Sequence, residues 1–348
     1  VRSGGNAMTK MKTIFAIIFL ALLIPVLLAA PESEAKVYRG KCKSNLTWSY
    51  DSKTKTMVID CKGDMPDDEQ FYDLDMVWRK YYFKTKKVIF KKGISSIGAG
   101  AFYNFQKLEE VVLPEGLRII KYDAFDGCRK LQFINKPSTL EVIEKDVFWD
   151  VKIKSISLKN LKKLGSECFS GAKLQSVDIP AKCKIEDSVF WSCKKLKKVT
   201  FEKGVKRISY GMFRETGIKN IDIPGSVAQI GTYAFANCQS LKKAIINEGV
   251  KKISKDAFSN TALEEITIPS TVTQLGKNAF RWESTEKSSL KKVVIRSKNI
   301  KKWGTMVFGA TRDDLVIYVP QSKKAEYEKI LRSTNGLDFH AKIVGKKW

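Results

Sequence analysis

Residues 263–280 read LEEITIPSTVTQLGKNAF and contain two short apolar phrases that together decide the fold. Ile266 and Ile268 alternate with polar residues, which is the two-residue period of a strand with one buried face. Pro269 has no backbone N–H to donate, so it ends that strand. Gly276 follows the second phrase and permits a tight turn, and Phe280 then points inward to fill the space that the turn encloses.

The same two phrases recur along most of the chain. The first returns at residues 108–114 and 174–180, and the second at residues 227–235. Each copy is marked by a small or apolar residue followed by Phe, and these phenylalanines are Phe102, Phe125, Phe148, Phe169, Phe190, Phe213, Phe235, Phe258, Phe280 and Phe308. Successive members are 23, 23, 21, 21, 23, 22, 23, 22 and 28 residues apart, and a polar insertion at residues 283–289 accounts for the last spacing.

A single unit of this length cannot bury its own apolar face, whereas stacked copies bury one another's. Strands of neighbouring copies would pair about 4.8 Å apart, so ten copies would form a stack roughly 45 Å long. With 43% hydrophobic residues the chain has enough material for such a core. The sequence therefore predicts a β-rich solenoid of about ten repeats of 21–23 residues, with a capping segment at each end.

The phrase L-x-x-V-x-I-P…V-x-x-I-G-x-x-A-F-x-x-C resembles the treponemal-type leucine-rich repeat of BspA-like surface proteins. The resemblance covers residues 88–320, about two-thirds of the chain, and the copies around Phe148 and Phe169 depart from it because they lack the usual Ile-Pro phrase. It implies a leucine-rich-repeat solenoid that is secreted or attached to the cell surface, binds host molecules or other cells, and has no catalytic role.

The ends of the chain suggest four segments. Lys10 and Lys12 precede an apolar run at residues 14–30, and small residues precede a cut after Ala35, so residues 1–35 are expected to comprise upstream residues and a secretory signal peptide. An uncleaved membrane anchor is the alternative, although the run is at the short end of the ~17–25 residues that span a bilayer. Residues 36–85 would form an N-terminal cap with a β-hairpin, residues 86–320 the solenoid, and residues 321–348 a C-terminal cap with a short helix and a strand.

Seven cysteines in an exported protein suggest disulfide bonds. Cys42 and Cys61 flank the expected hairpin, so we expect a disulfide between them, with two reduced and packed thiols as the alternative. Cys128, Cys193 and Cys238 each follow a repeat phenylalanine by three residues, which favours a packing role for a small buried side chain. Cys168 and Cys183 have no clear assignment.

The chain lacks the residues that common active sites require. His340 is the single histidine, so neither a Ser-His-Asp site nor a zinc site with histidine ligands is expected around it. No P-loop, dinucleotide-binding glycine motif or H-E-x-x-H motif is present. We expect no enzymatic activity, no cofactor and no metal site.

Basic residues form the first candidate binding surface. Without residues 1–35 the chain has 60 basic and 35 acidic side chains, a net charge of +25. Three lysine doublets occupy the two variable positions of the Leu-x-x-Val phrase and should stack along one edge, and they are Lys197–Lys198, Lys242–Lys243 and Lys291–Lys292. Glu109–Glu110 and Glu264–Glu265 fall in the same positions and interrupt this line. A solvated lysine coat that prevents edge-to-edge pairing is the alternative to a polyanion-binding surface.

Aromatic residues form the second candidate surface. Tyr103, Trp149 and Trp191 share the position directly after the repeat phenylalanine, where exposed rings could stack on sugars or contact a protein partner. The alternative is that they pack over the neighbouring copy. On the expected strands, the side chains that should point away from the core are Asp178, Thr200, Asp222 and Thr267.

These observations favour an extracellular, secreted or cell-surface protein that binds and does not catalyse. The leading hypothesis is recognition of an extracellular or host protein on the extended sheet face. The alternative is binding of an anionic polymer or glycan, such as teichoic acid, sulfated glycan or extracellular nucleic acid, through the basic charge. The two differ in salt dependence, because polyanion binding weakens steeply with ionic strength.

Overall fold

The computed structural model describes residues 35–42, 45–67, 78–283, 288–309, 314–334, 337 and 340–348. The expected signal peptide lies outside these residues except for Ala35. Within the described ranges, no helix combines the length and the apolar character needed to cross a membrane.

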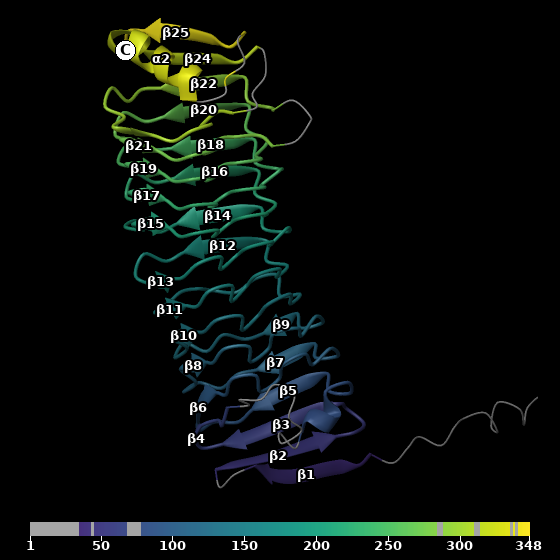
Figure 1. Cartoon of the computed structure of the whole chain (residues 1–348). Helices are drawn as coiled ribbons and strands as arrows, with labels where there is room; N and C mark the ends of the chain where they lie inside the picture. Colours follow the sequence, from purple (N-terminus) through teal and green to yellow (C-terminus); the bar gives the residue numbers. More distant parts are fainter. Residues whose placement is uncertain are drawn as a thin grey trace, which may run out of the picture.

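The chain winds into a stack of coils, all but one of which have one longer and one shorter strand (Figure 1). We number the coils 1 to 10 by their phenylalanine, from Phe102 to Phe308. The longer strands form the long-strand side and are β5 (Lys87–Phe90), β7 (Glu110–Val112), β9 (Phe133–Ile134), β12 (Ser176–Ile179), β14 (Lys198–Phe201), β16 (Asn220–Ile223), β18 (Lys243–Ile246), β20 (Glu265–Ile268), β22 (Lys292–Ile295) and β24 (Val316–Pro320). The shorter strands form the short-strand side and are β6 (Ile94–Ile97), β8 (Ile119–Ile120), β10 (Val142–Ile143), β11 (Lys163–Leu164), β13 (Lys184–Ile185), β15 (Arg207–Ile208), β17 (Gln229–Ile230), β19 (Lys252–Ile253), β21 (Gln274–Leu275) and β23 (Lys302–Trp303).

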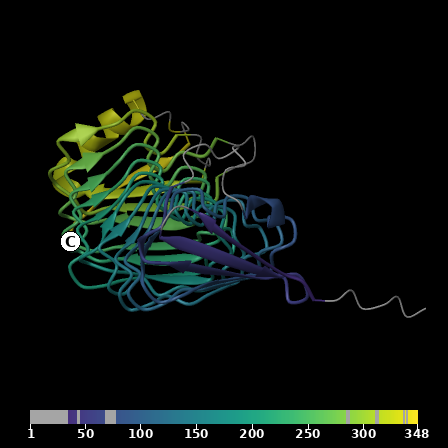
Figure 2. The same cartoon turned by 90° about the horizontal axis from the view of Figure 1, so that it is seen from below.

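Strands of neighbouring coils pair in parallel, and both sides of the stack are interrupted. On the long-strand side the sheet that ends at β9 is followed by the pair β12–β14 and then by a sheet from β16 to β25. Coil 4, around Phe169, contributes no long strand. Coil 3, which keeps only the two-residue β9, and coil 4 both lack the Ile-Pro phrase, so the departures in sequence accompany the first break of the sheet. Figure 2 looks along the stack and shows the coils lying one behind another.

The ten repeat phenylalanines form a single column through the core. Ring centroids of successive members lie between 5.1 and 6.0 Å apart, with interplanar angles of 2–18°. Their side chains are buried throughout, with at most 5% exposed. The solenoid that the spacing predicts is therefore confirmed, with phenylalanine filling each coil.

Backbone hydrogen bonds fix the spacing of the turns that hold the phenylalanines. The N–H of Phe213 donates to the carbonyl oxygen of Ala234 at 2.9 Å, and the N–H of Phe235 donates to Ala257 at 2.8 Å. Positive φ angles recur two residues before and two residues after the phenylalanine, as at Asp256 and Asn260 around Phe258. Asn, Asp and Gly adopt this conformation at low cost, which explains why they are common in the turns.

Gly276 is required for a different reason from the one expected. Its φ angle is not in the left-handed region, but a Cβ placed on it would lie 2.3 Å from the backbone nitrogen of Lys255 in the preceding coil. Glycine is therefore needed here because two coils approach closely, and not because the turn requires a special conformation.

The N-terminal cap begins with three strands that extend the long-strand side. β1 (Val37–Cys42), β2 (Leu46–Asp51) and β3 (Thr56–Cys61) pair antiparallel in that order, and β3 pairs in parallel with β5. β4 (Gly63–Asp64) joins the short-strand side, and η1 (Arg79–Tyr81) precedes coil 1. The Trp78 ring stacks on the Phe102 ring with 6.2 Å between their centroids, and so extends the phenylalanine column by one ring.

The predicted β2–β3 hairpin is present, but the disulfide expected between Cys42 and Cys61 is not formed. Cys42 lies on β1 and Cys61 on β3, and both are in register with Leu46 on β2, which separates them. Two strand spacings amount to about 9.6 Å, beyond the Cα separation that a disulfide spans. The prediction was wrong because the segment before the hairpin forms a strand of its own.

The C-terminal cap comprises η2 (Gln321–Lys323), α2 (Lys324–Thr334) and β25 (Lys342–Lys346), which pairs with β24. Tyr327 of α2 is fully buried, and its hydroxyl donates to the Ser297 carbonyl and accepts from the Ile300 N–H, both at 3.2 Å. The helix thereby covers coil 10 and closes the end of the core.

Candidate binding surfaces

The lysine doublets lie in register on the long-strand side, as their spacing predicts. Lys198 pairs with Ser176, Lys243 pairs with Asn220, and Lys292 pairs with Glu265. Lys197, Lys242 and Lys291 precede these residues and are also exposed. Lys219 occupies the same position in coil 7, because the Lys242 N–H donates to its carbonyl oxygen at 2.9 Å.

The glutamate doublets interrupt this lysine line and neutralise its ends. Glu110 lies 2.8 Å from the ammonium group of Lys87, and Glu265 lies 3.3 Å from that of Lys292. In coils 6 to 8 no described carboxylate lies within 4.0 Å of the lysine ammonium groups at these positions. In the part of the chain that the structure describes, the lysines of coils 6 to 8 at these positions therefore have no ion pair, and they are Lys197, Lys198, Lys219, Lys242 and Lys243.

A column of outward side chains runs beside the lysine line and changes character along the stack. In the middle it is polar, because Asp178 pairs with Thr200 in register and Asp222 accepts a hydrogen bond of 2.6 Å from the Asn247 side chain. Toward the C-terminus it becomes apolar. Its members there are Ile245, Thr267, Val294, Tyr318 and Val344, which we call the apolar column.

The apolar column is accessible and is bordered by charge. Ile245 is 42% exposed and Val344 is 39% exposed, and the other members are half-buried. The ammonium group of Lys346 lies 5.7 Å from the centre of the Tyr318 ring. The outward positions named from the sequence, Asp178, Thr200, Asp222 and Thr267, are all polar. Only Thr267 among them belongs to the apolar column, so the sequence pattern did not reveal this surface.

The three aromatic residues that follow the repeat phenylalanine do not form a continuous row. Tyr103, Trp149 and Trp191 lie in coils 1, 3 and 5, and Asp126 and Ser170 occupy the same position in the coils between them. Trp149 is 37% exposed, whereas Tyr103 and Trp191 are half-buried.

Trp191 belongs to a different arrangement of rings and cations. The guanidinium of Arg214 lies 5.6 Å from the Trp191 ring and 5.7 Å from the Tyr233 ring, and Lys255 lies 5.6 Å from Tyr233. These contacts hold Arg214 between two rings and cover part of the Trp191 face.

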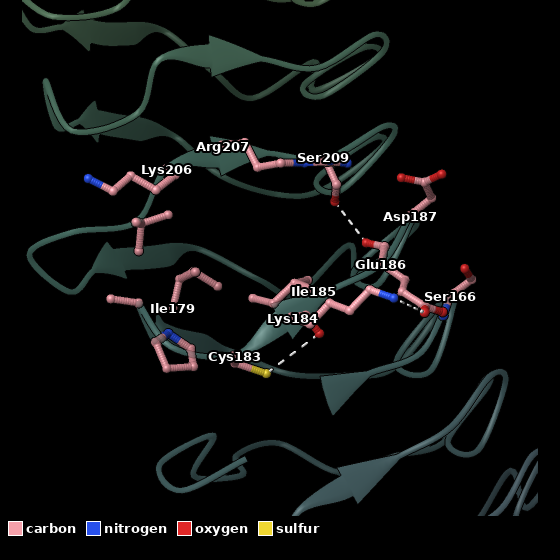
Figure 3. A pocket seen from close by; sticks show the side chains of 13 residues that line it. Ser166, Ile179, Cys183, Lys184, Ile185, Glu186, Asp187, Lys206, Arg207 and Ser209 are labelled. Atoms are coloured by element: carbon pink, nitrogen blue, oxygen red, sulfur yellow. Dashed lines mark hydrogen bonds and ion pairs between the residues drawn. The ribbon is translucent and has the colours of Figure 1, made fainter. Parts of the chain in front are cut away.

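A pocket of about 380 Å³ opens where the short-strand side breaks between β13 and β15 (Figure 3). In the neighbouring coils, a buried Leu or Val lies three residues before the end of the short strand, and these residues are Leu161 in coil 4 and Val205 in coil 6. Coil 5 has the exposed Lys182 at this position. The missing apolar side chain leaves space between Ile179, Ile185 and Val205.

The rim of this pocket is polar. The Ser209 hydroxyl donates to the Glu186 carbonyl oxygen at 2.8 Å, and the ammonium group of Lys184 lies 3.5 Å from the Glu186 carboxylate. Lys206 and Arg207 border the pocket on the side of coil 6. Burial raises the pKa of the Cys183 thiol in its wall to about 11, which disfavours the reactive thiolate.

Three cysteines share one buried position behind the phenylalanine column. The thiols of Cys128, Cys193 and Cys238 donate to the carbonyl oxygens of Phe102, Phe169 and Phe213 at 3.2, 3.0 and 3.0 Å. Burial raises the pKa of Cys193 to about 12 and that of Cys238 to about 11. The geometry therefore gives these thiols a structural role between coils.

Acidic side chains gather in the turns of coils 2 and 3. Burial, with the nearby charges of Asp123 and Asp146, raises the pKa of Asp126 to about 7. Across the described ranges, no three His, Cys, Asp or Glu side chains are arranged to hold a metal ion. His340 is exposed and lies just before β25.

Basic residues also line the short-strand side. Doublets lie at the start of the short strands in coils 4, 6, 8 and 10, and they are Lys162–Lys163, Lys206–Arg207, Lys251–Lys252 and Lys301–Lys302. The sequence carries a signal for these doublets, because each one directly precedes the Ile or Leu of the second apolar phrase, or Trp303 at that position in coil 10.

A family model of the BspA type leucine-rich repeat region matches six copies, over residues 80–197 and 162–287. A leucine-rich repeat protein from Eubacterium ventriosum ATCC 27560 has a similar structure with a TM-score of 0.57 and 20% identity, over 81% of this chain and 84% of that one. Another, from Bacteroides ovatus ATCC 8483, has a TM-score of 0.54 and 21% identity, over 87% of this chain and 90% of that one. These likenesses show the fold. No curated protein compared with the chain matches it.

Proposed function

Because the chain belongs to the BspA type leucine-rich-repeat family, we propose that it is an exported binding protein that recognises an extracellular or host protein on its long-strand side. The family is one of repeat proteins of the surface type, which is consistent with a binding or adhesion role. Export rests on the basic and apolar pattern of residues 1–35.

The apolar column is the observation that carries this proposal. Soluble proteins rarely expose contiguous apolar side chains without a partner, and protein interfaces combine an apolar centre with a polar rim. Ile245, Val294, Tyr318 and Val344 form such a centre on one straight line across four paired strands and the intervening β20.

The rim indicates the charge of the partner. Lys243, Lys292 and Lys342 lie two residues before members of the apolar column on the same strands, and Lys346 lies beside Tyr318. Because Glu265 is the single acidic residue among these rim positions, an apolar patch with an acidic border is the complementary surface. We therefore expect a protein partner with that chemistry.

The triple variant Ile245→Ser/Val294→Ser/Val344→Ser tests the proposal. Binding to a panel of purified extracellular-matrix and plasma proteins is measured at 0.15 M and 1 M NaCl. A true partner should remain bound at 1 M NaCl, because a packed apolar interface is weakly screened. The triple variant should bind that partner at least about tenfold more weakly, since central interface residues carry most of the binding energy.

The double variant Ile89→Ser/Val112→Ser is the matched control. Ile89 and Val112 occupy the same outward position at the other end of the stack and are half-buried, as Val294 is. Equal loss in both variants, or capture that disappears at 1 M NaCl for every protein, would rule out the proposed interface.

A further inference from the structure

The short-strand side carries two parallel lines of basic residues. In one line Arg207, Gln229, Lys252, Gln274 and Lys302 are in register on successive strands from β15 to β23. The second line lies one residue earlier and comprises Lys206, Ala228, Lys251, Thr273 and Lys301. From Ala228 onward, the N–H of each member donates to the carbonyl oxygen of the member before it at 2.9 Å. We call these ten residues the basic stripe. It lies on different strands from the apolar column.

Among the described residues, no ion pair neutralises the positive charge of the basic stripe. No described carboxylate lies within 4.0 Å of a charged nitrogen of its six basic residues. The same side differs in coils 2 to 5, where Glu141 pairs with Arg118 and Lys162, and Glu186 pairs with Lys163 and Lys184, at 2.9–3.5 Å. The free charge therefore begins at coil 6, at the rim of the pocket shown in Figure 3.

The charge is also periodic. Basic doublets occur in coils 6, 8 and 10, and the coils between them present Ala228, Gln229, Thr273 and Gln274. Since paired strands lie about 4.8 Å apart, the doublets repeat at about 9.6 Å. This distance is comparable with the length of one disaccharide unit in an extended polysaccharide, and Gln229 and Gln274 supply hydrogen-bonding groups between the charged positions.

We propose that the basic stripe binds a linear sulfated polysaccharide, which runs along the stack with one sulfated disaccharide for every two coils. A nucleic-acid duplex fits less well, because the phosphates of each of its strands follow at about 3.4 Å along the axis and most would meet no basic doublet. Binding of single strands also depends on aromatic rings that stack on bases. None of the ten residues of the basic stripe is aromatic.

The test compares two quadruple variants of equal net charge. In the first, Lys251, Lys252, Lys301 and Lys302 of the basic stripe are replaced by Gln, and in the second the exposed Lys197, Lys198, Lys242 and Lys243 of the long-strand side are replaced by Gln. Binding of heparin, desulfated heparin and an oligothymidylate is measured from 0.05 to 0.5 M NaCl. Equal thermal unfolding of the variants and the parent protein checks that folding is unchanged.

The basic-stripe variant should bind heparin on the order of 10²-fold more weakly at 0.15 M NaCl, and its slope of log K against log salt should fall by about 3, for four lost contacts at roughly 0.7–0.9 each. The long-strand variant should retain heparin affinity within about threefold, and desulfated heparin should bind neither protein. Equal loss in both variants would overturn the site, and so would unchanged binding by the basic-stripe variant. Tighter binding of oligothymidylate than of heparin would overturn the assignment to a polysaccharide. A failed search for a protein partner would leave this result unaffected, because the apolar column lies on other strands.

Discussion

Phe213→Ala is expected to lower the free energy of unfolding by about 3–5 kcal/mol, because it removes a fully buried ring and leaves a cavity that the neighbouring coils cannot close. Phe213 stacks between Phe190 and Phe235, with centroid distances of 5.7 and 5.4 Å, and none of its surface is exposed. Each stacked pair contributes about 0.5–1.5 kcal/mol beyond burial of the ring. Guanidinium unfolding followed by circular dichroism measures the loss.

Phe133→Ala is the control for that variant. Phe133 lies on β9 and is 62% exposed, so it is outside the phenylalanine column despite being the same residue type. Its replacement should change stability by less than about 0.5 kcal/mol. A loss below 1 kcal/mol for Phe213→Ala, or equal losses for the two variants, would show that the column does not hold the coils together.

Trp78→Ala is expected to destabilise the N-terminal end by a similar amount, about 3–5 kcal/mol. The indole of Trp78 is fully buried, stacks on Phe102, and donates through Nε1 to the carbonyl oxygen of Ala101 at 3.1 Å. In a repeat protein the terminal unit protects the adjacent internal coil from water. Loss of the Trp78 ring therefore exposes Phe102, the first ring of the phenylalanine column. Hydrogen exchange should therefore accelerate most in β5 to β8 and least near coil 10.

Trp149→Ala serves as the matched control, because the Trp149 ring is 37% exposed and lies outside the core. It should cost about 1 kcal/mol or less. If Trp78→Ala accelerated exchange evenly along the whole stack, the chain would unfold as one unit and the capping role of the N-terminal segment would be wrong.

The fold could be read from the sequence because one pattern recurs often enough to fix the register. Val and Ile alternate on the long strand, Pro or a turn follows, and Phe closes the coil, so neither Phe102 nor Phe308 has an alternative place in the core. The break at coil 4 was signalled by the missing Ile-Pro phrase. The close approach of two coils at Gly276 could not be predicted, because the sequence alone does not show whether a glycine is needed for its backbone conformation or for the closeness of a neighbouring coil.

Predictions for the sites were less complete, for reasons specific to the residues. The pairing of Cys42 with Cys61 assumed that the hairpin flanks are adjacent, but β1 places Cys42 on the far side of β2. The lysine doublets of the long-strand side were found from the first phrase alone, whereas Lys251–Lys252 occupy the two variable positions of the second phrase, between Val250 and Ile253. The apolar column was missed because its members occupy the outward position, where polar residues are expected, and only their alignment across strands makes them a surface.

Both proposed surfaces depend on all coils forming one continuous stack in the stated register. The most direct test is the distance between spin labels at Lys87→Cys and Lys292→Cys, with Cys42 and Cys183 replaced by Ser so that the remaining native thiols are buried. Lys87 and Lys292 occupy equivalent positions nine coils apart. Nine strand spacings predict a single narrow distribution of label-to-label distances at about 43 Å. A distance below about 25 Å, or a broad distribution, would contradict the stack and the surfaces that it presents.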